Sequence, residues 1–201
     1  MTIASGSAVR EELGMLSLAR RSLTYALGGF AYKGLALISV PLVARLLTPA
    51  ELGLLDYAAV VAAVVGLAVA AGSEQAVAYL DPRSTPDDRV WESTLVTIGS
   101  VAVAVLVPVG VVNEWLASLL TGDPENGPVI IAAALYGCVI ALTSVALNAV
   151  RLRGSPRAYA ITSFLVVAAE MAGAVMVALL VASPVTLMVV AWAGGASIVA
   201  L

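Results

Sequence analysis

The sequence contains no histidine and one cysteine, and charged residues make up only 11% of its 201 residues. Without histidine, Ser-His and Cys-His nucleophile pairs and the most common transition-metal ligand are excluded. The single cysteine, Cys138, excludes an internal disulfide and a zinc site built from several cysteines. Soluble domains contain about 25% charged and about 45–50% apolar residues, whereas this sequence is 61% hydrophobic. A water-soluble globular domain is therefore excluded.

The basic residues are also few and form no cluster that suits nucleic acid. Ten basic and thirteen acidic residues give a formal charge of −3, and the basic residues are scattered between apolar runs. Nucleic-acid-binding domains instead carry a basic patch or stripe. We expect no nucleic-acid partner, no catalytic residue, no metal and no cofactor.

Six long apolar runs dominate the sequence. The first five are each 18 residues or longer with few charges, which is enough to cross the roughly 30 Å hydrocarbon core of a bilayer as helices. We predict an all-α, polytopic transmembrane helix bundle that follows a cytoplasmic N-terminal segment, residues 1–21. The predicted spans are residues 22–46, 54–73, 93–112, 129–150, 158–182 and 185–201.

The first and last runs need separate interpretation. Residues 22–46 form a run that is too long for a cleaved signal segment, so we expect a retained helix. The last run, residues 185–201, would give about 25 Å of helix, slightly less than a full crossing. We expect the sequence to stop inside this helix, as a fragment of a longer protein.

The second run carries a row of small residues. Ala58, Ala62, Gly66 and Ala70 recur every four residues, so they share one helix face and leave a shallow groove. We expect the backbone of a neighbouring helix to approach closely along this groove.

The connections between runs are predicted from their turn-forming and polar residues. Residues 47–53 read as a tight turn and residues 113–128 as a loop. Asp56 and Glu74 lie at the two ends of the second run, and we interpret both as solvated caps.

The distribution of arginine predicts the orientation in the membrane. With a cytoplasmic N-terminus, eight of the ten basic residues fall in cytoplasmic segments and none in the opposite connections. This is a strong positive-inside signal. Nine arginines to one lysine, with abundant alanine and valine, indicate a GC-rich prokaryotic gene and therefore a cell membrane.

Two charges of opposite sign are predicted near the middle of the membrane. Lys33 and Glu170 each lie about 17 Å from the cytoplasmic start of their spans. A charge at this depth costs at least about 2.5–3.5 kcal/mol, so it normally faces a polar cavity or pairs with another charge. Lys33 and Glu170 are therefore candidates for lining a functional cavity, or for a purely structural ion pair.

Two further polar residues are candidates for substrate binding. Arg45 lies near the outer end of the first span, where its side chain reaches the lipid headgroups, or lines a cationic cavity with Lys33 if Pro41 bends the helix. Asn148 lies near the cytoplasmic end of the fourth span, where it binds substrate or makes an interhelical hydrogen bond.

The hairpin at residues 41–57 is similar to a known family. It places Ala-Arg-Leu-Leu before Pro49, Glu51 and Gly53, where proline and glycine shape the turn and the glutamate caps the next helix. This pattern resembles the first hairpin of the polysaccharide transporters, which are lipid-linked oligosaccharide flippases of the multidrug, oligosaccharidyl-lipid and polysaccharide exporter superfamily. The basic Lys33 in the preceding helix also resembles that family.

The resemblance implies a fold and a function. The chain would form the N-terminal lobe of a MATE-like two-lobe transporter, with the C-terminal lobe absent. The substrate would be an undecaprenyl-type lipid that carries a pyrophosphate-linked oligosaccharide to the outer leaflet. Lys33 and Arg45 would attract the pyrophosphate, and Glu170 would hold Lys33 or take part in ion coupling. The implied partners are the bilayer, this substrate, coupling ions and the second lobe.

Three other functions compete with this interpretation. A related exporter would move lipid II or cationic drugs, although Lys33 disfavours a cationic substrate. A membrane-embedded glycan polymerase or glycosyltransferase tends to need large outer loops or paired acidic metal ligands, and the longest outer loop here has about 16 residues. A structural subunit would retain function with Lys33 and Glu170 both neutralised.

Overall fold

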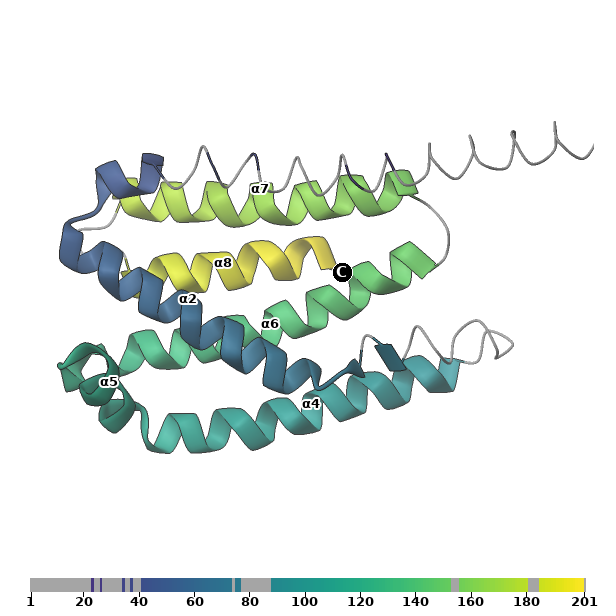
Figure 1. Cartoon of the computed structure of the whole chain (residues 1–201), viewed down its shortest axis with the longest axis horizontal. Coiled ribbons are helices and arrows are strands. Elements are labelled where there is room, and N and C mark those ends of the chain that lie inside the picture. The colour runs from purple at the N-terminus through teal and green to yellow at the C-terminus, as the bar shows by residue number, and fades with distance from the viewer. Residues whose placement is uncertain are drawn as a thin grey trace, which may run out of the picture.

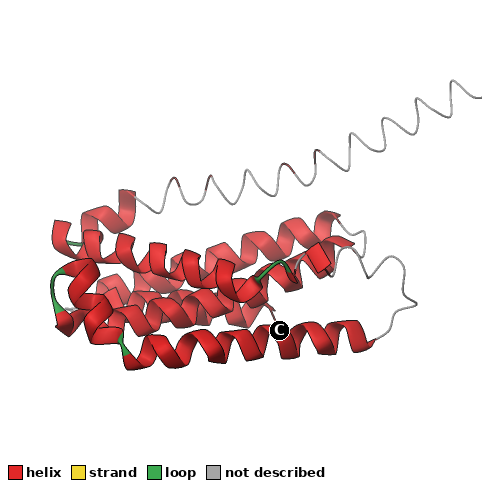
Figure 2. Cartoon of the chain, turned by 60° about the horizontal axis from the view of Figure 1, so that its bottom comes forward, coloured by secondary structure: helices red, strands yellow, loops and turns green. Residues whose placement is uncertain are grey.

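The computed structural model describes residues 23, 26, 34, 37, 41–73, 75–76, 88–152, 156–180 and 185–200. All regular secondary structure in these residues is helical. The elements are α2 (Pro49–Ala70), α4 (Asp88–Val111), α5 (Asn113–Thr121), the 3-10 helix η1 (Pro124–Asn126), α6 (Gly127–Leu152), α7 (Pro156–Leu180) and α8 (Val185–Ala200). The loops drawn in green in Figure 2, which join helices through described residues, are short.

Four helices, namely α2, α4, α6 and α7, are long and apolar enough to cross a membrane, and α8 is a shorter apolar helix. The predicted polytopic helical bundle is therefore confirmed. Of the first predicted span, the structure describes residues 23, 26, 34, 37 and 41–46, all of them helical. The rest of that span, including Lys33, lies outside the described residues.

Helix α6 is the centre of the bundle. It contacts α2, α4, α5, α7 and α8, and it is the most deeply buried of the four spans. Figure 1 shows α7 and α4 at opposite edges, with α2, α6 and α8 between them. Side chains on α6 therefore face neighbours on several sides, and polar groups there meet other helices rather than lipid.

Helix α2 begins earlier than the sequence predicted. Thr48 is the N-cap, Pro49 occupies the first helical turn, and Thr48 and Glu51 form a capping box. The Thr48 N–H donates to Glu51 Oε2 at 2.8 Å, and the Glu51 N–H donates to Thr48 Oγ1 at 3.3 Å. The predicted cap by Glu51 is confirmed, but the tight turn over residues 47–53 is wrong, because proline and a capping threonine start the helix there and Gly53 lies inside it.

Between α4 and α6, the predicted loop over residues 113–128 is wrong. This segment contains α5 and η1, joined by Gly122 in the left-handed conformation (φ 77°). Ala117 of α5 is fully buried, whereas Trp115 and Leu119 are exposed. A helix of nine residues is too short for the span criterion. It forms because one of its faces packs against the bundle.

The row of small residues on α2 lies against α6, as the sequence predicted. Ala58, Ala62 and Gly66 are buried. A Cβ atom added to Gly66 would lie 3.1 Å from the carbonyl oxygen of Gly137, and one added to Gly137 would lie 2.5 Å from that of Ala62. The two backbones therefore touch at a crossing that tolerates only small residues.

A second close crossing joins α7 to α8. A Cβ atom on Gly195 would lie 2.8 Å from the backbone nitrogen of Glu170, and one on Gly173 would lie 3.2 Å from the Cβ of Ala191. Glycine at positions 173 and 195 therefore brings the α7 backbone at Glu170 directly against α8.

The outer surface of the bundle is apolar along its length. Large hydrophobic side chains are exposed on α4 and α7, including Val96, Val103, Val107, Ile161 and Leu179. So much exposed apolar surface is uncommon on soluble proteins and suits contact with lipid chains.

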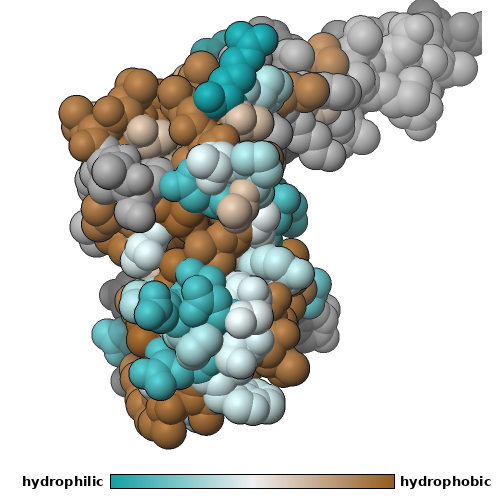
Figure 3. Space-filling view, turned by 90° about the vertical axis from the view of Figure 1, so that its left-hand side faces the viewer, coloured by the Kyte–Doolittle hydropathy of each residue, from teal (hydrophilic) through white to brown (hydrophobic). Residues whose placement is uncertain are grey.

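The two ends of the bundle differ in charge. The end that carries α5 and η1 shows a hydrophilic area bordered by hydrophobic residues (Figure 3). Its acidic residues are Glu51, Glu114, Asp123 and Glu125. The opposite end carries Arg89, Arg151 and Arg157, at the start of α4, the end of α6 and the start of α7. Three of the four described arginines thus lie at this end, where the start of α4 also carries Asp88 and Glu92, and Arg45 is the exception.

The capping box at the start of α2 makes a measurable contribution to stability. We expect Thr48→Ala to lower the free energy of unfolding by about 1 kcal/mol, because Glu51 N–H loses its acceptor. Thr48→Ser retains the hydroxyl and should unfold like the wild type. Thermal unfolding in detergent micelles, followed by circular dichroism, measures the difference. Equal destabilisation by alanine and serine would show that the cap is not the cause.

Candidate functional site

A polar cluster lies where α6, α7 and α8 meet. The Tyr136 hydroxyl on α6 donates a hydrogen bond to Glu170 Oε1 on α7, with 3.1 Å between the oxygens. The Tyr136 ring lies against the indole of Trp192 on α8, with ring centroids 5.6 Å apart and planes at 42°. We refer to Tyr136, Glu170 and Trp192 as the polar cluster. It joins three helices through one carboxyl group and two aromatic rings.

The packing of α7 against α8 places Glu170. Glu170 is half-buried, near the middle of the 25-residue α7. Since Gly195 allows α8 to touch the Glu170 backbone, the carboxylate extends to α6, where it meets Tyr136. An ionisable side chain at mid-membrane depth is expensive and normally has a partner in the bundle interior. The Tyr136 hydroxyl supplies that partner here.

One donor of the polar cluster is unsatisfied. The Trp192 Nε1 atom is buried and has no hydrogen-bond partner among the described residues. A buried indole N–H usually finds an acceptor, because an unpaired donor costs about 1–3 kcal/mol. Among the described residues, the indole N–H is therefore a buried donor that lacks an acceptor.

A cavity of about 240 Å³ borders the polar cluster at Trp192. Its walls are mainly apolar and come from the segment before α2 and from α2, α7 and α8. The lining residues are Val43, Leu52, Leu55, Asp56, Ala59, Met171, Ala174 and Trp192. The cavity suits an apolar chain with a polar group at one side.

Asp56 is the acidic residue of this cavity, and its predicted role is wrong. The sequence placed it at the end of a span, as a solvated cap, together with Glu74. Because α2 begins at Pro49, Asp56 lies two turns inside the helix, where it is exposed and lines the cavity. Glu74 lies outside the described residues.

Of the four residues predicted to bind substrate, the structure describes Arg45, Asn148 and Glu170, and these three do not lie together in one site. Glu170 belongs to the polar cluster. Arg45 is exposed at the end of the helical segment before α2, an arrangement that fits a side chain reaching the headgroups. Asn148 is half-buried on α6, about 18 Å along the helix from Tyr136. Lys33 lies outside the described residues, and so does its predicted pairing with Glu170.

Sequence reasoning missed two members of the polar cluster. Neither Tyr136 nor Trp192 was proposed from the sequence as a site residue. The available signal was the presence of hydrogen-bonding aromatic residues inside apolar runs, since their polar atoms need partners when buried. That signal identifies aromatic residues that need a hydrogen-bond partner, but it does not show which residue the partner is.

The chemistry open to the polar cluster is limited. Among the described residues, no group of three or more His, Cys, Asp or Glu side chains is placed to hold a metal ion. The cluster contains one carboxyl group, one hydroxyl and one indole N–H. These groups can bind a cation or polar headgroup, or exchange a proton.

The model of the polysaccharide biosynthesis protein family matches residues 42–199. No curated protein and no solved structure gave a significant match. The family match covers the hairpin at residues 41–57, apart from Pro41, and all described helices from α2 to the last residues of α8. The resemblance to polysaccharide transporters is thereby confirmed, and the chain belongs to the polysaccharide biosynthesis protein family.

Proposed function

We propose that the protein moves lipid-linked oligosaccharides from the inner to the outer leaflet of the cell membrane by alternating access. The observation that carries the proposal is the family match over residues 42–199 in a chain whose described part is a membrane helix bundle. The substrate class is an undecaprenyl-type lipid with a pyrophosphate-linked oligosaccharide. The proposal includes no enzymatic step.

The polar residues have distinct proposed roles. Lys33 and Arg45 attract the pyrophosphate, because a cation compensates an anion for its lost hydration in a low-dielectric cavity. Glu170 interacts with Lys33 between cycles or couples transport to an ion, and Asn148 contacts the substrate. The apolar cavity beside Trp192 supports a lipid substrate, since it suits a hydrocarbon segment.

The charge asymmetry of the bundle supports a cytoplasmic N-terminus. Arg89, Arg151 and Arg157 lie at one end, which we place at the cytoplasmic surface by the positive-inside rule. The acidic end with α5 and η1 then faces outward. Alternating access requires a second lobe that rocks against this one, and we propose that the whole protein contains it.

The test measures flipping in proteoliposomes that contain the whole protein and a fluorescent undecaprenyl-pyrophosphate oligosaccharide. We expect wild-type protein to expose the label to an added quencher, and Lys33→Ala to slow this about fivefold because one charge-assisted contact to pyrophosphate is lost. Lys33→Arg keeps the charge and should remain close to wild type.

Matched controls separate charge loss from damage to the fold. Arg157→Gln also removes one positive charge, from an exposed position at the end of the bundle, and should not alter the rate. Equal rates in wild type, Lys33→Ala and Lys33→Arg would assign Lys33 a structural role. No flipping by wild-type protein, with the same protein exporting lipid II or a cationic drug, would overturn the proposed substrate.

A further inference from the structure

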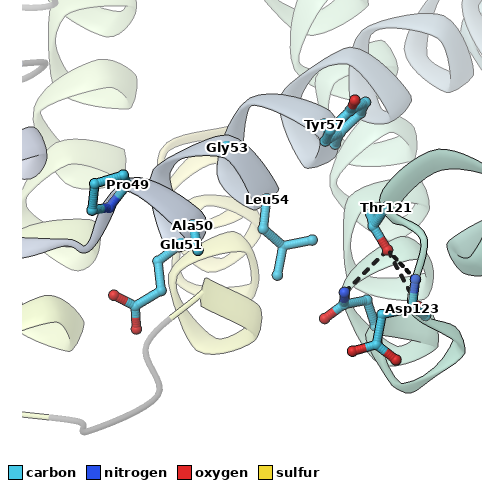
Figure 4. Close-up of a pocket in the computed structure, with 9 residues that line it drawn as sticks. Pro49, Ala50, Glu51, Gly53, Leu54, Tyr57, Thr121 and Asp123 are labelled. Atoms are coloured by element: carbon cyan, nitrogen blue, oxygen red, sulfur yellow. Dashed lines mark hydrogen bonds between the residues drawn. The ribbon is translucent and has the colours of Figure 1, made fainter.

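A second cleft lies at the acidic end of the bundle, apart from the polar cluster. Its volume is about 480 Å³, within the range of about 300–1,000 Å³ of small-molecule sites. One wall comes from the first turns of α2 and the other from the turn between α5 and η1 (Figure 4). The lining residues are Pro49, Ala50, Glu51, Gly53, Leu54, Tyr57, Thr121, Asp123 and Asn126.

The wall formed by the α5–η1 turn is held in place by its own hydrogen bonds. The Thr121 hydroxyl donates to the carbonyl oxygen of Ala117 at 2.8 Å and accepts from the Asn126 side-chain amide at 3.0 Å. Asp123 Oδ1 accepts from the Glu125 N–H at 2.9 Å. The polar groups of Asp123 and Asn126 are therefore fixed before any ligand arrives.

The wall formed by α2 combines a flat face with an aromatic ring. Pro49, Gly53 and Tyr57 recur every four residues, so they share one helix face. A Cβ atom on Gly53 would have nothing within 4 Å, so the backbone there is open to the cleft. The Tyr57 side chain is 47% exposed. The result is a shallow surface that ends in an accessible aromatic ring.

The charge of the cleft is negative. Glu51 and Asp123 contribute carboxylates, and none of the described lining residues is basic. The Glu51 carboxylate is turned to Thr48, so it contributes charge more than a free acceptor. Asp123 is exposed and uses Oδ1 in the turn, which leaves a second oxygen to accept hydrogen bonds.

These features match the chemistry of a saccharide. A sugar ring has an apolar C–H face that packs on an aromatic ring, and hydroxyl edges that bond to carboxylates and amides. We propose that this cleft binds one to a few sugar units, neutral or amino sugars in preference to uronic acids. The inference rests on the proposed function, because the acidic end faces outward there and receives the glycan.

The test measures binding of three soluble tetrasaccharides to the protein in nanodiscs by isothermal titration calorimetry. The probes are a glucosamine tetramer, cellotetraose and tetragalacturonate, which are cationic, neutral and anionic. We expect the glucosamine tetramer to bind most tightly and tetragalacturonate at least about fivefold more weakly than cellotetraose, because opposite charges attract across the cleft. Equal binding of all three, or binding of none, would overturn the proposal.

Variants locate the binding to the cleft. Tyr57→Ala should weaken all binding about three- to tenfold through loss of the ring contact. Asp123→Asn keeps the Oδ1 acceptor of the turn but should reduce the preference for the glucosamine tetramer, because only the Glu51 charge remains. The matched controls are Trp115→Ala, an exposed aromatic of α5, and Glu125→Gln, an exposed carboxylate of η1, neither of which lines the cleft. Loss of binding in the controls alone would move the site elsewhere.

Comparison with the flipping assay separates the two proposals. Wild-type flipping without any tetrasaccharide binding would overturn the saccharide site and leave the transport function in place. Binding that depends on Tyr57 and Asp123, without flipping by wild-type protein, would support the site and overturn the transport function.

Discussion

Gly137→Leu is expected to prevent the bundle from folding, because the position has no room for a side chain. A Cβ atom there would lie 2.5 Å from the Ala62 carbonyl oxygen, 2.8 Å from the Val65 Cβ and 3.0 Å from the Gly66 nitrogen. Two of these atoms belong to the α2 backbone, so rotation of a side chain cannot relieve the overlap. Overpacking costs about 1–3 kcal/mol in adaptable cores, and a clash with backbone costs more.

The size of the effect follows from the position of α6. Because α6 contacts every other helix of the described bundle, displacement of α2 from α6 disturbs the central packing rather than one edge. Size-exclusion chromatography and thermal unfolding in detergent measure the outcome. We expect Gly137→Leu to aggregate or to lose its cooperative transition. A cooperative transition at the wild-type temperature would show that α2 and α6 do not cross here.

Adjacent glycines of α8 provide a matched control for this reasoning. A Cβ atom on Gly195 would lie 2.8 Å from backbone atoms of Ala169 and Glu170, whereas one on Gly194 would meet nothing within 4 Å. Gly195→Ala should therefore destabilise the protein, by about 1–3 kcal/mol. Gly194→Ala should be neutral or stabilising, by up to about 1 kcal/mol, because alanine is the better helix former.

Spacing along one helix was enough to predict part of this packing. The four-residue period predicted a row of Ala58, Ala62, Gly66 and Ala70, and the buried part of this row, from Ala58 to Gly66, packs against α6. The sequence did not identify Gly137 as the partner, because the contact joins two helices far apart in the chain. A pattern on one helix specifies which face packs, and the partner depends on how all the helices assemble.

Boundaries and short elements were less predictable for a related reason. Apolar composition placed the start of the second span at residue 54, whereas Thr48 and Pro49 start the helix earlier. Helix α5 escaped detection because its helical state depends on burial of Ala117 against the rest of the bundle. Both errors also concerned candidate functional residues. The first concealed that Asp56 lies two turns inside α2, and the second concealed the α5–η1 wall of the cleft at the acidic end of the bundle.

In the candidate site, too, the sequence predicted a property of one helix but not the contact between helices. The membrane depth of Glu170 could be inferred from its place in an apolar run, and this identified it as a functional candidate. Its partner is Tyr136, which is 34 residues away in sequence. The sequence also predicted a pairing of Glu170 with Lys33, from equal depth and opposite charge, and that pairing stays a prediction because Lys33 lies outside the described residues. Equal depth is a necessary condition for contact, but which helices are neighbours decides between candidates.

Glu170→Gln is expected to reduce flipping by at least about tenfold while the protein stays folded. Glutamine has nearly the same shape and retains an oxygen that can accept from the Tyr136 hydroxyl, so little packing is lost. It cannot carry a negative charge or release a proton. An interhelical hydrogen bond in a membrane protein contributes about 0.6 kcal/mol on average, so loss of an average bond corresponds to about a threefold effect, which is less than the tenfold loss expected here.

The companion variants distinguish a transport role from a structural role. Tyr136→Phe removes the donor and leaves the carboxylate, and we expect a smaller loss of flipping with a change in its pH profile. Glu170→Asp retains the charge and should recover part of the activity. Glu114→Gln neutralises an exposed carboxylate at the end of the bundle and should behave like wild type.

Rates in proteoliposomes and unfolding temperatures in detergent must be measured on the same preparations. A normal flipping rate in Glu170→Gln, with lower thermal stability in Tyr136→Phe, would show that the polar cluster only stabilises the packing of α6 against α7. A lost rate at unchanged stability would place the charge of Glu170 in the transport cycle. The carboxylate then serves transport from the same contact that holds it between the helices, because its hydrogen bond to Tyr136 keeps it inside the bundle, available to a cation or a proton.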